Sequence, residues 1–158
     1  MFPKMRRSKQ ALSPEEMESI LLGGTSGVLA LQGEDGYPYT VAVHFVYLDG
    51  RIYFHGLNAG QKLENIARCP RVCFETDVLD GLLAEDLQTP CSADSAYRSV
   101  VITGDAALVG DMEKGRPLAA LVEKYTPRWA HLEMPAARVR GTAVAAVTPR
   151  TMTGKKHA

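Results

Sequence analysis

The sequence predicts a mainly β protein, a six-stranded antiparallel barrel or closed sheet with about three helices packed outside it. Six segments are rich in β-branched or apolar residues, and turn signals such as Asp49-Gly50 join the first three without an intervening helix. Three other segments have the spacing of an amphipathic helix. A doubly wound parallel sheet is disfavoured, because parallel strands need long crossover connections.

The first helix is predicted from Ser13 to about Leu22. In "LSPEEM", Ser13 and Glu16 occupy the two positions of a capping box, and Pro14 occupies the first helical position. Gly23-Gly24 ends the helix.

Three consecutive strands are predicted next, at residues 25–32, 37–48 and 51–56. Residues 33–36 (Gly-Glu-Asp-Gly) and 49–50 (Asp-Gly) are turn sequences. These segments therefore predict a three-stranded meander.

The rest of the chain continues the alternation of strands and helices. Residues 62–69 have helical spacing, and Pro70 stops that helix. We expect a third helix around 118–125, whose start is obscured by Gly115 and Pro117. The remaining predictions are strands at 71–79, 97–110 (bent at Gly104) and 138–149, and a long loop at 80–94.

The totals favour one domain over residues 1–158, with a basic N-terminal arm at 1–12 and a C-terminal tail at 150–158 that is either frayed or docked. Lysines plus arginines number 18, as do aspartates plus glutamates, so no overall charge attracts nucleic acid or an anionic membrane. The basic group Lys4, Arg6, Arg7 and Lys9 is more typical of a solvated end or a dimer contact. No apolar run approaches the roughly 20 residues of a membrane span, and the N-terminus is a poor signal peptide. We predict a cytoplasmic protein that binds neither nucleic acid nor membrane.

The three cysteines, Cys69, Cys73 and Cys91, indicate reduced thiols. Their number is odd, and Cys69 and Cys73 lack the C-x-x-C spacing of redox or zinc sites. We assign no metal site.

The stretch "FHGLNAGQK" is the first candidate site. Lys62 falls in the first turn of a helix, where the helix dipole disfavours a cation. Free N–H groups, the flexible positions Gly56 and Gly60, and an ammonium together could hold a phosphate. The spacing is one residue short of a P-loop and lacks its Ser/Thr, so nucleoside triphosphate chemistry is disfavoured. A surface lysine after a flexible loop remains the alternative.

His55 ends the third predicted strand, where the chain enters this loop. A histidine titrates near neutral pH and could exchange a proton with a redox ligand. A histidine that only makes a hydrogen bond at the end of a strand is the alternative.

Several ordered segments resemble one family. These are "GGTSGVLALQGEDGYPYTVAVHFVYLDGRIYFHGLNAGQKLENIARCPRVCF", "YRSVVITGDAALV" and the terminal "TGK". They resemble the pyridoxamine-5′-phosphate-oxidase-related, FMN-binding split-barrel proteins, and most closely the Nim-type (5-nitroimidazole resistance) subgroup. The resemblance extends over nearly the whole chain, from about Met1 to Lys155.

The resemblance implies an FMN-binding homodimer with the flavin in a cleft between subunits. Its second strand, next to the flavin ring, corresponds to Tyr39, Thr40, Val41, Ala42 and Val43. His55 corresponds to a histidine near the flavin, and Lys62 to a lysine that holds the phosphate, within the loop that contains Gly56, Asn58, Gly60 and Gln61. Arg98, Ser99 and Lys155 correspond to segments that commonly complete the partner subunit's site.

The chain departs from Nim-type sequences at two places. Gln61 replaces a common histidine, and Ala42-Val43-His44-Phe45 replaces a common Pro-Leu-Ser-Tyr. Glutamine can still donate hydrogen bonds to a phosphate. Whether His44 faces flavin, core or solvent is left open.

The resemblance implies a flavin-dependent reductase that takes electrons from NAD(P)H or another donor and reduces a small planar acceptor, with His55 as proton donor or orienting group. One alternative is a pyridoxamine-5′-phosphate oxidase, for which Arg51, Arg68 and Arg71 form no recognisable second phosphate site. The other is a flavin- or haem-binding carrier or sensor without turnover, in which a histidine (His44, His55, His131 or His157) ligates haem. Trp129 is predicted either to pack in the core or a dimer contact, or to line the cleft.

Overall fold

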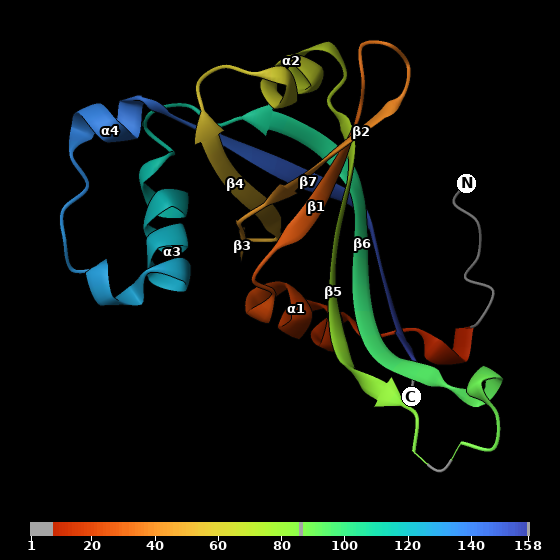
Figure 1. Ribbon diagram of the computed structural model, residues 1–158. Helices are drawn as coiled ribbons and strands as arrows, with labels where there is room; N and C mark the ends of the chain where they lie inside the picture. Colours follow the sequence, from red (N-terminus) through yellow and green to blue (C-terminus); the bar gives the residue numbers. More distant parts are fainter. Residues whose placement is uncertain (1–7, 86, 158) are drawn as a thin grey trace.

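The computed structural model describes residues 8–85 and 87–157, and over that part of the chain it contains one sheet (Figure 1). The strands are β1 (Gly27–Gln32), β2 (Pro38–Val43), β3 (Phe45–Leu48), β4 (Arg51–Leu57), β5 (Arg71–Leu83), β6 (Asp94–Leu108) and β7 (Thr142–His157). The α-helices are α1 (Pro14–Gly23), α2 (Gln61–Arg68), α3 (Gly115–Tyr125) and α4 (Ala136–Arg140). Short 3₁₀ helices are η1 (Ser8–Gln10), η2 (Pro90–Ser92) and η3 (Pro127–Trp129).

The architecture is mainly β and antiparallel throughout, as predicted, but the described residues contain seven strands and four α-helices, not six and about three. The extra strand arises at His44, which interrupts the predicted strand 37–48 and divides it into β2 and β3. The extra helix, α4, replaces the predicted start of the last strand, which begins at Thr142 and not at 138.

The predicted three-stranded meander is wrong. The strand order is β2-β1-β5-β6-β7-β4-β3, so β2 and β3, neighbours in sequence, form the two opposite edges of the sheet. Within the described chain no β ladder joins them, so the sheet is split at this point and is not closed, which corrects the predicted closed sheet. The side-chain alternation hid this break, because Val43 and Phe45 are both buried on either side of His44.

Local turn and cap signals were predicted correctly. Ser13 and Glu16 form the capping box at α1, with the Ser13 N–H donating to Glu16 Oε2 at 2.7 Å. Asp49 and Gly50 both have positive φ, 51° and 76°, as a two-residue hairpin of this twist requires. Helix α3 begins at Gly115 because Pro117 is tolerated in a first helical turn.

The long loop predicted at 80–94 is shorter in the structure. Strand β5 continues to Leu83 and pairs with the start of β6, across a register irregularity near Gly81. The tail after 149 is docked, because β7 pairs with β6 as far as His157. Strands β5, β6 and β7 thus extend well beyond the rest of the sheet (Figure 1), and η2 lies at the end away from α3 and α4.

Two apolar clusters hold these elements in place. The larger one lies inside the curved sheet and centres on Phe45, Phe54 and Phe74, each at most 1% exposed. The smaller one packs α3 against the sheet through Val46, Leu118, Leu121 and Val144. The second cluster fixes α3 beside the end of β4.

Two other sequence expectations concern parts of this framework. The cysteines Cys69, Cys73 and Cys91 are free thiols. Of the basic residues near the N-terminus, only Lys9 falls within the described residues; Lys4, Arg6 and Arg7 lie outside them. No helix in the described ranges is long and apolar enough to cross a membrane.

Candidate functional site

The end of β4 and the start of α2 bring His55, Gly56 and Lys62 together. A Cβ atom at Gly56 would lie 3.2 Å from Lys62 Nζ, so the absent side chain at position 56 leaves the space that the ammonium occupies. The ammonium also lies 5.2 Å from the Phe54 ring centroid. Partial burial lowers the pKa of Lys62, and none of the described carboxylates forms an ion pair with it. An anion bound here would relieve that unfavourable environment.

The N-terminus of α2 adds backbone donors to the same place. Gly60 precedes the helix with φ 126°, a conformation that favours glycine, and provides no side-chain cap. The N–H groups of Leu63 and Glu64 donate to the Gly60 carbonyl, whereas those of Gln61 and Lys62 have no acceptor among the described residues. Two free amides beside an unpaired ammonium have the donor set of a phosphate site.

His55 lies at the junction of two cavities. One, of about 400 Å³, is bounded by His44 and by the side of α3 that carries Leu118, Leu121 and Tyr125. The other, of about 450 Å³, is bounded by Gly56 and Leu57 of β4 and by residues near α4. Burial lowers the pKa of His55, and positive charge on His44 or Lys62 lowers it further, so the imidazole is mainly neutral at pH 7.

His44 faces the first of these cavities, which settles the orientation that the sequence left open. Its ring stacks on Tyr125, with ring centroids 4.4 Å apart and planes 19° from parallel. The Tyr125 hydroxyl accepts the Phe45 N–H at 2.9 Å and donates to the Phe45 carbonyl at 3.0 Å. Sequence reasoning missed Tyr125, because its partners at 44 and 45 lie on another element far away in the chain.

The predicted ring-contacting segment, Tyr39 to Val43, forms most of β2. This strand is one edge of the sheet, pairing with β1 on one side only. Its outer backbone groups are therefore open to a ligand or to another chain. Asn58 is held on the α4 side of the loop, since its amide donates to the Arg140 carbonyl at 3.4 Å.

Within one chain, Arg98, Ser99 and Lys155 do not join this group. His55 pairs with Val144 on β7, whereas Ser99 pairs with Lys155, near the other end of β7. That stretch of strand spans roughly 35 Å at the usual rise per residue. Arg98 is also engaged by Asp80, to which it donates two hydrogen bonds of 2.6 and 2.8 Å. Within one chain these residues are therefore separate from the His55 site.

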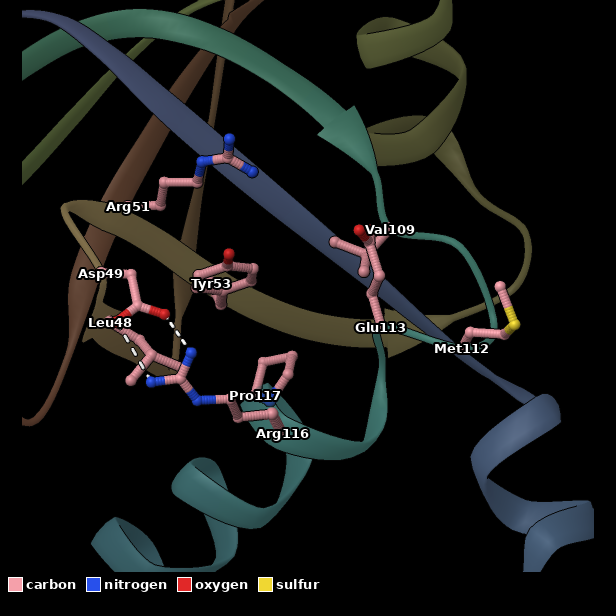
Figure 2. Close-up of a pocket in the computed structure, with 9 residues that line it drawn as sticks. All are labelled: Leu48, Asp49, Arg51, Tyr53, Val109, Met112, Glu113, Arg116 and Pro117. Carbon is pink, nitrogen blue, oxygen red and sulfur yellow. Dashed lines mark hydrogen bonds and ion pairs between the residues drawn. The ribbon is translucent and has the colours of Figure 1, made fainter.

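A further cavity, of about 330 Å³, lies beside the β3–β4 hairpin (Figure 2). Arg51 and Arg116 line it together with Tyr53, so the structure does group two arginines that have no common sequence motif. Asp49, which pairs with Arg116, and Glu113 line the same cavity, and these carboxylates oppose an anion. The cavity is thus a poor second phosphate site.

Trp129 does not pack in the core, which corrects one of its predicted placements. Its side chain is 52% exposed on η3, and the Arg128 guanidinium lies 5.1 Å from its ring. It does not line either cavity beside His55. No group of three or more metal-ligating side chains was found among the described residues.

The described part of the chain is a split antiparallel sheet in which a cationic turn, residues 56–62 with Lys62 at its end, follows β4. The chain belongs to the pyridoxamine 5′-phosphate oxidase family, whose model matches residues 13–156. No curated protein sequence matches the chain.

Solved structures share the fold. A proposed 5-nitroimidazole antibiotic resistance protein from Bacteroides thetaiotaomicron is 24% identical, with a TM-score of 0.80 over 92% of this chain and 86% of that one. An FAD- and haem-binding protein from Mycobacterium smegmatis is 22% identical, with a TM-score of 0.83 over 94% and 73% of the two chains. An FAD-binding protein from Mesorhizobium loti is 21% identical, with a TM-score of 0.68 over 94% and 98%. Flavin-binding proteins are therefore among the structures that this chain resembles.

Proposed function

We propose that the protein is an FMN-dependent reductase of small planar acceptors, related in activity to nitroimidazole reductases. One observation carries the proposal: Lys62 lies beside Gly56 and two free amides, next to His55 and an apolar cavity. These features support a phosphate-binding role for Lys62, beside a neutral imidazole and a space for an aromatic ring. Flavin-binding structural relatives support the cofactor class.

The residues present fit a flavin mononucleotide. Bound FMN would supply hydride and electron transfer, which no protein side chain here can provide. The Lys62 ammonium and the amides of Gln61 and Lys62 would bind the terminal phosphate. FMN is favoured over FAD because an ammonium beside the uncapped N-terminus of a helix suits a terminal phosphate dianion.

His55 would bind and protonate the acceptor. Since its pKa is lowered, the imidazole is neutral at pH 7 and offers one N–H donor and one acceptor nitrogen. It would hold the acceptor by the N–H, and it would deliver a proton to the reduced acceptor from its imidazolium form, after taking up a proton from water. The apolar side chains of α3 would exclude water from the same space.

We further propose that the active form is a cytoplasmic homodimer. Arg98, Ser99 and Lys155 of one chain would then reach the β2 edge and His55 site of the partner, which explains why they lie so far from His55 within one chain. NAD(P)H is the proposed electron donor.

The phosphate assignment is tested by comparing FMN with riboflavin, which lacks the phosphate. Lys62→Met should weaken FMN binding about 10- to 150-fold, the equivalent of one charged hydrogen bond of about 1.5–3 kcal/mol. Riboflavin affinity should change little. Lys9→Met, at an exposed position away from Lys62 and the start of α2, is the control. Equal weakening of FMN and riboflavin would contradict the assignment.

A carrier or sensor that binds flavin or haem without turnover is a second candidate, favoured by the two histidines that line one cavity. The visible spectrum of the purified protein, recorded before and after anaerobic NADPH, distinguishes the two functions. Flavin bands that bleach support the reductase. A haem band, or flavin that stays oxidised with every nicotinamide donor, supports the carrier.

A further inference from the structure

The cavity between β4 and α3 has two imidazoles on one side and an apolar wall on the other. His44, between β2 and β3, and His55, on β4, line the same space. The side chains of Leu118, Leu121 and Val122 on α3 close it. At about 400 Å³, the cavity has room for a ligand of one or two aromatic rings.

The His44 ring is held in place before any ligand binds. It stacks on Tyr125, and the Tyr125 hydroxyl is fixed by two hydrogen bonds to the Phe45 backbone. Val43 and Phe45 are buried toward the core, so the side chain between them points away from it. The structure thus fixes a polar ring at the cavity, where a flexible side chain would lose more entropy on binding.

The two histidines also interact electrostatically, since positive charge on His44 lowers the pKa of His55. The His55 ring is therefore mainly neutral at pH 7, and it offers one N–H donor to the cavity. Neutral imidazoles donate N–H groups to uncharged or weakly charged oxygen atoms. Nitro and carbonyl groups on aromatic rings carry such oxygens.

We propose that His44 is a specificity residue of the acceptor site, where it and His55 hydrogen-bond the oxygen atoms of a flat nitroaromatic compound that packs against α3. This inference rests on the proposed reductase function, and it adds His44 to the residues of that site. His44 hydrogen-bonds the nitro group, and the aromatic ring of the ligand packs against the apolar side chains of α3.

The test measures binding directly, by calorimetric titration of the FMN-loaded protein with 2-methyl-5-nitroimidazole and with 2-methylimidazole. His44→Phe keeps an aromatic ring on Tyr125 and removes the hydrogen-bonding nitrogens. It should weaken nitroimidazole binding about 3- to 10-fold, as expected for one neutral hydrogen bond, and leave 2-methylimidazole binding unchanged. His131→Phe, at an exposed position that does not line this cavity, should match the wild type.

Three results would overturn the role of His44. If His44→Phe binds the nitroimidazole as tightly as the wild type does, His44 is not a specificity residue. Equal weakening of both probes would show that His44 only shapes the cavity, and weaker FMN binding in His44→Phe would place His44 against the flavin. FMN affinity of the wild-type protein is measured first. A protein that binds no FMN would refute the proposed function, and the same titrations on the protein as purified would still decide the role of His44.

Discussion

Replacing Tyr125 by Phe tests how much the Tyr125 hydroxyl stabilises the backbone at the start of β3. The Tyr125 hydroxyl makes two hydrogen bonds to the backbone of Phe45, of 2.9 and 3.0 Å, just after the break at His44. Phenylalanine keeps the aromatic ring and its packing on His44, so the change removes one oxygen atom and little else.

The cost follows from what the substitution leaves behind. Phe45 is fully buried, and its N–H and carbonyl would both lose their partner. A buried polar group left without a partner costs about 1–3 kcal/mol. Because Tyr125 is only half-buried and water can reach part of the gap, we expect a total near the low end, about 2 kcal/mol. For a chain of this length that lowers Tm by about 4–8 °C.

Thermal unfolding followed by circular dichroism measures the effect, with Tyr47→Phe as the matched control. Tyr47 is also half-buried and packs against the core, but within the described residues its hydroxyl makes no hydrogen bond. The control should shift Tm by no more than about 2 °C, as expected for a change of up to about 0.5 kcal/mol. If both variants lose the same stability, or if Tyr125→Phe matches the wild type, the two hydrogen bonds of the Tyr125 hydroxyl do not stabilise the fold.

Two further predictions concern stability. Gly27→Ala would place a Cβ 2.3 Å from Phe74 Cζ and should lower the free energy of unfolding by about 1–3 kcal/mol, measured by urea titration. Gly23→Ala, whose Cβ would have no atom within 4 Å, should not lower it. Equal effects of the two substitutions would contradict the packing argument. Because the folded-state pKa of His55 is lowered, the unfolded chain binds the proton more tightly, and stability should fall as pH drops through about 6.5. His55→Gln should therefore lose less stability than the wild type between pH 7.5 and 5.5 in urea titrations, and an identical loss would mean that His55 does not titrate in that way.

The parts of the fold that depend on residues close together in the sequence could be predicted from the sequence. The capping box of Ser13 and the hairpin at Asp49-Gly50 each involve groups a few positions apart. The cationic turn was readable for the same reason, since Gly56 and Lys62 are separated by one loop. In each case a local pattern specifies the contact without knowledge of the rest of the chain.

The remaining features depend on contacts between distant segments. The alternation of buried and exposed residues continues through His44, so nothing local marks the point where the chain leaves one edge of the sheet for the other. The stack of His44 on Tyr125 joins β2–β3 to α3, and no spacing rule links the two positions. Residues 80–83 lack a strand pattern of their own and are strand only because β6 lies beside them.

The order of the strands also determines when the protein can fold. Strand β7 lies between β6 and β4, so β4 gains its second neighbour only from a segment made more than eighty residues later. Before β7 arrives, the β3–β4 hairpin that carries His55 is not joined to the rest of the sheet, and both β4 and β6 present an unpaired edge. Non-local pairing of this kind makes folding slow, and unpaired edges invite association with other chains. A nascent or truncated chain without β7 is therefore the form of this protein most exposed to aggregation through strand edges.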